Sequence, residues 1–250
     1  SGDIYQVVLS QRFEIPFKKS SISFYRSLRR LNPSPFLFHF NFKDFFVVGS
    51  SPEILVRLRN NECTIRPIAG TRPRGTNKAE DLSLKEELLN DPKERAEHLM
   101  LLDLGRNDVG RVSKPGSVEV TESFSVEMYS HVMHIESEVK GKLRDGMDSL
   151  DALIAGFPAG TVSGAPKIRA MQIIEELENE KRGLYSGAVG YFSASGDLDT
   201  CIALRTGIIK DGKLYVQAGG GIVHDSTNHG EELETRNKAK ALIRAAELAD

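Results

Sequence analysis

Short β-branched and aromatic runs, separated by two-residue turn signals, constrain the fold of this 250-residue chain more than any other feature. The turn signals are Lys43-Asp44, Asn60-Asn61, Ser195-Gly196 and Asp211-Gly212. Asn, Asp and Gly tolerate the backbone conformations that tight hairpins need, so each signal predicts a pair of neighbouring antiparallel strands. The chain is therefore expected to contain extensive antiparallel sheet.

Helical periodicity marks a second set of segments around these strands. They are residues 20–31, 82–90, 92–107, 148–157, 165–179 and a last helix from about Gly230. Asp91 is the expected N-cap of the third segment, with Pro92 at its first helical position. Residues 70–81 are rich in turn formers and predict a loop, whereas 124–143 alternates as strands do. No composition break divides the chain, which predicts a single α+β domain over 1–250.

Composition excludes several classes of protein. The net charge of -2 is not gathered into a basic block, which argues against nucleic-acid and anionic-membrane partners. No run of about 18 apolar residues is present, as a membrane-spanning helix would need. Cys63 and Cys201 form neither a disulfide framework nor a paired metal motif, so we expect a cytoplasmic protein. The first residues lack methionine and read as mid-strand, which predicts a fragment of a longer protein.

Two E-x-x-E pairs lie far apart in the sequence. They are Glu94 with Glu97 and Glu231 with Glu234. Carboxylates that converged would raise one another's pKa values, and Mg²⁺ resolves this because it takes oxygen ligands directly and through water. A second interpretation stays open, because Glu94 can cap a helix behind Asp91 and Glu234 can pair with Lys238 on the surface.

The last helix also suggests where its carboxylates point. Positions 231, 234 and 238 share a helical face with 242, 245 and 249, which are Leu, Ala and Ala. We therefore expect both glutamates to extend a buried stripe.

Other polar or glycine-rich stretches are candidates for chemistry. Glu53 follows Pro52 at a strand entry, where a partly desolvated carboxyl group can serve as an acid. Gly70 and Thr71 offer backbone N–H groups, and Gly219–Gly221 allow close approach of a ligand. Each glycine segment can equally be a plain turn. No phosphate-loop motif occurs, so nucleotide binding is unsupported.

In this order, nine segments together resemble the chorismate-binding enzymes, and within them the anthranilate synthase branch. They are GDIYQVVLSQRF, SPEILV, RPIAGTRPRG, ERAEHLMLLDLGRND, HVMHIESEV, FPAGTVSGAPKIRAMQII, YSGAVGYF, CIALRT and GGGIV. The resemblance covers essentially the whole chain. It implies an α+β fold with large antiparallel sheets packed face to face and helices outside, in four layers, and it implies that the family's N-terminal region is absent.

The resemblance also implies a role for each matching residue. Glu97 and Glu234 would bind Mg²⁺ directly, and Glu94 and Glu231 would hold its waters. The enolpyruvyl carboxylate of chorismate would meet Tyr185, Arg205 and the amides of Gly219, Gly220 and Gly221, with Lys238 nearby. Gly70, Thr71 and His134 would line the ring, and Glu53 would protonate the departing C4 hydroxyl. His134 is also the implied participant in the aromatising step.

Two positions distinguish branches of the family. Isochorismate-forming members carry a lysine that activates water where this chain has Gln6, and aminodeoxychorismate synthases often carry a nucleophilic lysine where it has Ala69. With both lysines missing, ammonia is the implied attacking group at C2. One departure from the family pattern is STNHGEEL before the last helix, where D-P-x-x-E-Y is common.

The resemblance therefore implies a Mg²⁺-dependent lyase that converts chorismate and ammonia to anthranilate and pyruvate. Neither cysteine has the context of a glutaminase nucleophile, so ammonia is expected from a separate glutamine amidotransferase subunit. Two alternatives to this lyase stay open. The first is an aminodeoxychorismate or aminodeoxyisochorismate synthase, and the second is a truncated, catalytically silent chorismate-binding domain.

Overall fold

The computed structural model describes residues 2–129 and 132–250, which form two compact units. The terminal unit, named for containing both chain ends, comprises Ser1–Glu53, Val162–Val189 and Cys201–Asp250. The central unit comprises Ile54–Thr161 and Gly190–Thr200. The chain thus passes between the units four times. The predicted single domain over 1–250 stays a prediction.

The terminal unit is built on a six-stranded sheet with the order β2-β3-β12-β13-β1-β9. Its strands are β1 (Gln6–Pro16), β2 (Phe36–Asn41), β3 (Phe46–Ser51), β9 (Gly164–Ala165), β12 (Thr206–Lys210) and β13 (Lys213–Ile222). The longest pairing is antiparallel, between β1 and β13, and runs from Val7 opposite Ile222 to Pro16 opposite Lys213. This pairing places the three glycines of β13 next to the beginning of the chain.

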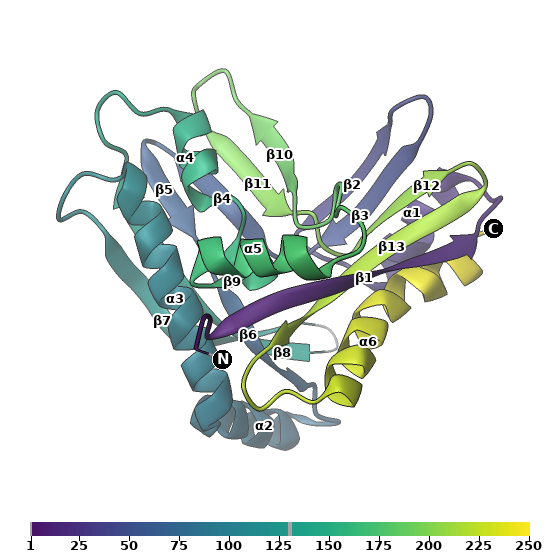
Figure 1. The fold of residues 1–250 in the computed structure, drawn as a ribbon, viewed down its shortest axis with the longest axis horizontal. Coiled ribbons are helices and arrows are strands. Elements are labelled where there is room, and N and C mark those ends of the chain that lie inside the picture. The colour runs from purple at the N-terminus through teal and green to yellow at the C-terminus, as the bar shows by residue number, and fades with distance from the viewer. Residues whose placement is uncertain (1, 130–131) are drawn as a thin grey trace. The chain divides into compact units, whose positions relative to one another are not determined.

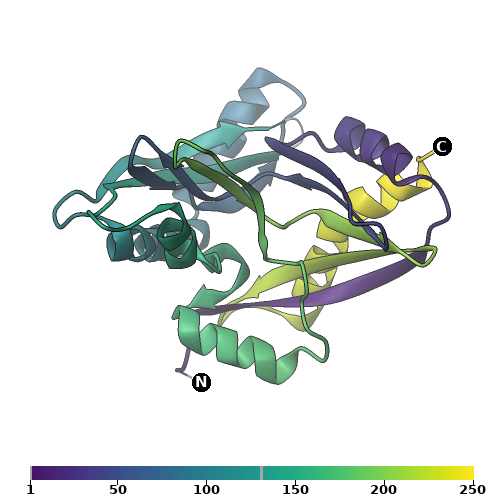
Figure 2. The ribbon, with the colours of Figure 1, turned by 90° about the horizontal axis from the view of Figure 1, so that it is seen from above.

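Three helices accompany this sheet: α1 (Ser21–Leu31), α5 (Lys167–Leu177) and α6 (Asn228–Glu247). α6 runs along β13 (Figure 1), and α1 and α6 lie side by side (Figure 2). Their apolar faces bury Phe24, Leu28 and Leu242 against Leu214 and Val216 of β13. Burying these side chains stabilises the unit because apolar surface leaves water.

The central unit contributes most of a seven-stranded sheet with the path β10-β11-β4-β5-β8-β6, and β7 pairs with β8. The strands are β4 (Ile54–Arg59), β5 (Glu62–Ile65), β6 (Ile68–Pro73), β7 (Glu119–Met128), β8 (Val132–Lys142), β10 (Ala188–Phe192) and β11 (Leu198–Ile202). The helices are α2 (Lys78–Asn90), α3 (Pro92–Val112) and α4 (Ser149–Gly156), followed by a 3-10 turn at Gly160–Val162. A Cβ atom at Gly105 would lie 3.7 Å from Ile65 and 3.8 Å from Val139, so α3 packs closely on β5 and β8.

Most of the predicted elements are confirmed. Lys43, Asn60, Asn61 and Asp211 have positive φ angles, as tight hairpin turns require. The Asp91 carboxylate accepts hydrogen bonds from the backbone N–H groups of Lys93 and Glu94 at 2.9 and 3.2 Å, so it caps α3 as expected. The α+β class and the large antiparallel sheets are confirmed, whereas the four-layer packing stays a prediction.

The predicted loop at 70–81 is wrong in extent. β6 continues to Pro73 because it pairs with β8 across Thr71–His134 and Pro73–Val132. α2 begins at Lys78 because the side chain of Asn77 caps its first turn. The predicted strand region 124–143 divides into β7 and β8, and its residues 130–131 lie outside the described part of the chain. Across the described residues, no helix is both long and apolar enough to cross a membrane.

Candidate functional site

In the terminal unit, the glycines of β13 bring two side chains directly onto the strand. A Cβ atom at Gly219 would lie 2.7 Å from the Tyr185 hydroxyl oxygen and 2.9 Å from the Leu9 carbonyl oxygen. A Cβ atom at Gly221 would collide with the Gln6 side-chain amide. Only glycine leaves room for these contacts, so the packing gives a physical reason for the glycines beyond chain flexibility.

Tyr185 and Glu53 occupy the same neighbourhood. Tyr185 is 9% exposed, and burial is the main cause that raises the pKa of its hydroxyl to about 12. Arg182 and hydrogen bonding to the Gly219 backbone oppose this rise in the pKa, while the charges of Glu178 and Glu53 add to it. Glu53 is buried, and its carbonyl oxygen accepts a hydrogen bond from the Ile202 N–H at 3.0 Å. The Ala203 carbonyl oxygen, next along the chain, accepts a hydrogen bond from the Ser186 N–H at 3.2 Å, so Glu53 and Tyr185 flank the same backbone segment. The structure therefore brings together three residues that the resemblance assigned to one site.

Glu231, in the first turn of α6, has one satisfied and one unsatisfied carboxylate oxygen. The Ser226 hydroxyl donates to Oε1 at 2.6 Å. Oε2 is buried and has no hydrogen-bond partner within the described part of the chain. It lies 2.8 Å from the position of a Cβ atom at Gly220. A buried carboxylate oxygen without a partner is costly, so this position suits a cation or a hydrogen-bond donor.

Glu234 differs from the expectation of a buried stripe. The buried face of α6 carries Thr235, Ala239 and Leu242, whereas the side chains of Glu234 and Lys238 are 47% and 50% exposed. Each helical residue turns the chain by about 100°, so positions 234 and 238 lie beside the stripe that Glu231 extends. The two side chains form the surface ion pair that the alternative interpretation described, with a distance of 2.6 Å.

Lys238 nevertheless reaches the glycine strand. Its Nζ donates a hydrogen bond to the Gly219 carbonyl oxygen at 3.1 Å.

Arg205 lies in the connection between β11 and β12, half-buried, with a φ angle of 45° that non-glycine residues rarely adopt. Its carbonyl oxygen accepts a hydrogen bond from the Ser50 N–H at 3.1 Å, which fixes this strained conformation.

In the central unit, Gly70, Thr71 and His134 meet where β6 pairs with β8. Gly70 has a φ angle of +72° and forms a bulge between Ala69 and Thr71. His134 Nδ1 lies 3.1 Å from the Gly70 carbonyl oxygen and 3.0 Å from Thr71 Oγ1. A carbonyl oxygen only accepts hydrogen bonds, so Nδ1 carries the proton of the neutral ring and Nε2 carries the lone pair. The bulge thus fixes the orientation of the His134 ring through Nδ1.

Arg72 places Glu94 beside Gly70. The three nitrogen atoms of its guanidinium donate to Glu87, Asp91 and Glu94 at 2.8, 2.8 and 3.1 Å. Glu94 Oε2 lies 3.1 Å from the position of a Cβ atom at Gly70. Glu97, three residues further along α3, is half-buried. Arg72 was not among the residues predicted from the sequence, although it directly follows two of them.

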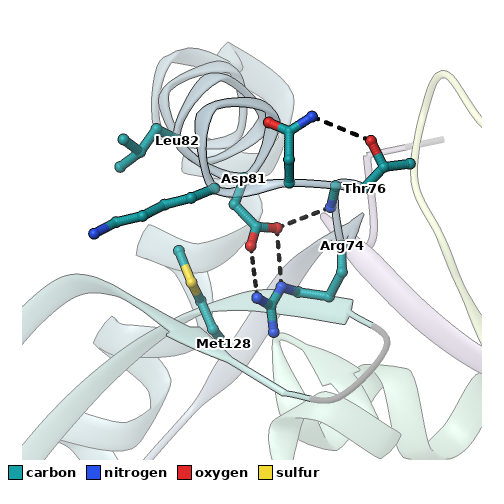
Figure 3. A pocket seen from close by; sticks show the side chains of 8 residues that line it. Arg74, Thr76, Asp81, Leu82 and Met128 are labelled. Carbon is teal, nitrogen blue, oxygen red and sulfur yellow. Dashed lines mark hydrogen bonds and ion pairs between the residues drawn. The ribbon is translucent and has the colours of Figure 1, made fainter.

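A cavity of about 450 Å³ lies just beyond this strand (Figure 3). Its lining is Arg74, Gly75, Thr76, Asn77, Lys78, Asp81, Leu82 and Met128. Arg74 donates hydrogen bonds from Nε and Nη2 to the Asp81 carboxylate at 2.9 and 2.6 Å. Its Nη1 donates to the Tyr129 carbonyl oxygen at 2.6 Å. None of the predicted site residues lines the cavity, and the Arg74–Asp81 pair instead fixes the chain that leaves β6.

The two E-x-x-E pairs belong to different units: Glu94 and Glu97 to the central unit, Glu231 and Glu234 to the terminal unit. In residues 2–129 and 132–250, no group of three or more His, Cys, Asp or Glu side chains is arranged to hold a metal ion. The convergence of the pairs on Mg²⁺ therefore stays a prediction.

Comparison with known proteins agrees with the resemblance seen in the sequence. Residues 1–244 match a family model described as chorismate binding enzyme. The chain is 64% identical over 249 residues to anthranilate synthase component 1 of Cereibacter sphaeroides, covering 100% of this chain and 50% of that relative. It is 60% identical over 250 residues to the protein of the same name from Pseudomonas aeruginosa, covering 100% of this chain and 51% of that relative.

Solved structures show the same likeness. Anthranilate synthase component I from Streptococcus pneumoniae superposes with a TM-score of 0.91 and 52% identity, over 96% of this chain and 53% of that one. MenF, the menaquinone-specific isochorismate synthase of Escherichia coli, gives a TM-score of 0.89 and 27% identity, over 98% and 56%. The chain spans about half the length of the curated relatives it matches.

Proposed function

Because the chain belongs to the family of chorismate-binding enzymes, we propose that it carries the site at which an anthranilate synthase converts chorismate and ammonia to anthranilate and pyruvate. Relatives named anthranilate synthase component 1 are 56% to 64% identical to it, against 27% for the isochorismate synthase MenF. The identity to relatives of this name supports the anthranilate branch, and the difference separates it from the isochorismate-forming branch.

One observation carries the proposal: the cluster of Glu53, Tyr185 and Gly219 in the terminal unit. A chorismate carboxylate on the glycine strand would meet the Tyr185 hydroxyl, with Arg205 as the cationic partner. Glu53 is buried and so shielded from bulk water, as an acid that protonates a departing hydroxyl group must be. These side chains supply binding and proton transfer but no nucleophile, which agrees with ammonia as a co-substrate.

The proposed chemistry has two stages. Ammonia attacks C2 of chorismate, and the C4 hydroxyl leaves as water after it takes a proton from Glu53. In the second stage the C2 proton is removed, pyruvate leaves and the ring becomes aromatic. His134 fits the base of this stage, because its Nδ1 proton faces the Gly70 carbonyl oxygen and its Nε2 keeps a lone pair.

We propose Mg²⁺ as the cofactor, held by Glu97 and Glu234 and through water by Glu94 and Glu231. A bound Mg²⁺ would neutralise the ring carboxylate of chorismate. The unpartnered buried Oε2 of Glu231 supports this, since it is an acceptor in need of a cation or donor. Arg72 already pairs with Glu94, and Lys238 with Glu234. Glu94 would therefore be shared between Arg72 and a water of the metal ion, and Glu234 between Lys238 and the metal ion itself.

We also propose that a glutamine amidotransferase subunit supplies the ammonia, in the cytoplasm. Cys63 and Cys201 are both 1% exposed, and burial raises the pKa of the Cys63 thiol to about 12. Such thiols are poor nucleophiles, and neither offers the accessible thiolate that glutamine hydrolysis needs. Cys63 and Cys201 are not joined in a disulfide, as in a reducing compartment.

The test is the fluorescence of anthranilate formed from chorismate, Mg²⁺ and an ammonium salt. We expect anthranilate and equal amounts of pyruvate with ammonium, and neither product with glutamine alone. Glu53→Gln should keep chorismate binding, measured by thermal shift, and abolish turnover. An aminated product without pyruvate would favour the aminodeoxychorismate alternative, and full turnover of the Glu53 variant would remove that residue as the acid.

The metal assignment needs its own measurement. Glu231→Gln should weaken the Mg²⁺-dependent rise in melting temperature, whether or not chorismate is present, because the neutral amide no longer attracts the cation. Glu232→Gln, at an exposed neighbouring carboxylate that pairs with Arg236, is the matched control. Equal Mg²⁺ responses of the two variants would refute the role of Glu231.

A further inference from the structure

Arg182, which follows α5, forms a buried ion pair with Glu178. The side chains of Arg182 and Glu178 are 14% and 8% exposed, and Nη2 lies 2.6 Å from Oε1. Nη1 donates to the Val162 carbonyl oxygen and Nη2 to the Val8 carbonyl oxygen, both at 2.6 Å. One guanidinium therefore ties the end of α5 to β1 and to the segment before β9.

Every N–H donor of this guanidinium has a partner inside the terminal unit. Nε donates to Glu178 Oε2 at 2.9 Å, and the second proton of Nη1 faces the Ser186 hydroxyl at 3.2 Å. Together with the two carbonyl contacts and Glu178 Oε1, these partners use all five donors. Arg182 thus has no donor left for a substrate and can influence one only through a neighbour.

That neighbour is Tyr185. The Arg182 guanidinium carbon lies 5.4 Å from the centre of the Tyr185 ring, within range of a cation–π interaction. The other end of the ring places its hydroxyl against Gly219. Ser186, next in sequence, has a φ angle of 61°, a strained conformation that its contact with Arg182 helps to hold.

Glu178 anchors the same assembly to the glycine strand from a second direction. Its Oε1 accepts hydrogen bonds from both the N–H and the hydroxyl of Ser10 at 2.8 Å. Ser10 is the residue of β1 that lies opposite Gly219 of β13. Arg182 fixes the tyrosine ring and Glu178 fixes the strand beside it, so the pair sets the distance between the Tyr185 hydroxyl and Gly219.

We infer that Arg182 and Glu178 are positioning residues that orient the Tyr185 hydroxyl toward the carboxylate of the bound substrate, and so control substrate affinity without touching substrate. This inference rests on the proposed function. It predicts a change in KM with little change in kcat, because the geometry of proton transfer from Glu53 is not altered.

Arg182→Lys is the test variant, because it keeps the charge beside Glu178 but loses the fork that reaches both carbonyl oxygens. We expect KM for chorismate to rise about 10-fold, equivalent to about 1.4 kcal/mol, with kcat within about 2-fold of wild type. Arg12→Lys is the matched control. Arg12 anchors the same segment through Glu180 and the Lys181 carbonyl oxygen, both at 2.6 Å, and its hydrogen bonds to described residues end at these two groups and at Gln217 rather than at Tyr185. Its KM should stay at the wild-type value.

A double-mutant cycle tests the route through Tyr185. On a Tyr185→Phe background, Arg182→Lys should raise KM by less than about 2-fold, because the hydroxyl that Arg182 orients is already gone. Equal effects on both backgrounds would overturn the inference, as would a fall in kcat with unchanged KM. If Arg182→Lys folds poorly, the neutral pair Glu178→Gln with Arg182→Met leaves no uncompensated buried charge and takes its place.

A measurement without substrate separates this inference from the proposed function. The chain has six tyrosines, and labelling with 3-fluorotyrosine makes each one visible by fluorine NMR. The resonance that Tyr185→Phe removes should move in Arg182→Lys and stay in place in Arg12→Lys. An unmoved resonance would refute the positioning role even in an active enzyme. Wild-type protein that makes no anthranilate would refute the proposed function while leaving this readout intact.

Discussion

His98 should make the protein lose stability as the pH falls from about 6.5 to about 4. The side chain is fully buried on the packed face of α3, directly after Glu97 in the sequence. Its ring packs edge-on against Phe124 with centroids 4.8 Å apart, and Nε2 lies 2.7 Å from the Ser137 hydroxyl. Burial lowers the pKa of His98 to about 4, because the charged ring would lose its hydration.

The size of the effect follows from linkage. In the unfolded chain a histidine has a pKa of about 6.5, so the unfolded state takes up the proton first and is favoured as the pH drops. Between pH 7 and pH 5.5 the expected loss is about 1.2 kcal/mol, rising to about 3.4 kcal/mol once both states are protonated. The loss expected by pH 5.5 depends mainly on the pKa of the histidine in the unfolded chain, because the buried His98 ring is still neutral at that pH.

Urea unfolding followed by far-ultraviolet circular dichroism gives the free energy of unfolding at each pH. The pH-dependent loss should be smaller in His98→Gln by about 1.2 kcal/mol, since a glutamine amide can replace the Ser137 contact but does not titrate. His224→Gln, at an exposed histidine, should keep the full wild-type dependence. Parallel stability curves for wild type and His98→Gln would show that the buried ring does not cause the loss.

Three further substitutions test the packing described above. Gly219→Ala should raise KM for chorismate, because its Cβ would lie 2.7 Å from the Tyr185 hydroxyl; an unchanged KM would remove that contact from the site. Asp81→Asn should lower the melting temperature above pH 4 but match wild type as the pH approaches 2, since Arg74 lowers the pKa of Asp81 to about 2; a constant gap would contradict this. Leu242→Ala, at a residue 1% exposed, should cost about 2–5 kcal/mol in urea unfolding, and a loss below 1 kcal/mol would mean that the cavity collapses.

Local signals in the sequence predicted the elements of the fold well. Asn60 and Asn61 adopt positive φ angles because asparagine itself tolerates that conformation. Asp91 caps α3 through N–H groups only two and three residues away. The end of β6 was missed because it depends on the β8 residues opposite Thr71 and Pro73. No local propensity at 70–81 contains that information.

The candidate site was predictable in part. The resemblance named Tyr185 and Gly219, and their contact in the terminal unit follows from the register of β13 and the fold of the chain after α5. The prediction for Glu234 was wrong because residues spaced three or four apart define the centre of a buried helical stripe only to within one position. Arg182 was missed because its i,i+4 pairing with Glu178 looks like a surface pair until the carbonyl oxygens of Val8 and Val162 surround it.

The pairing of β1 with β13 has a consequence for how the protein is made. Val7 leaves the ribosome long before its partner Ile222 exists, and the whole central unit is synthesised in between. β1 must therefore wait, unpaired on that side, until β13 has emerged. A shortened transcript that ends before β13 would leave this strand exposed, and chaperone binding to such nascent chains should persist until the glycine-bearing strand appears.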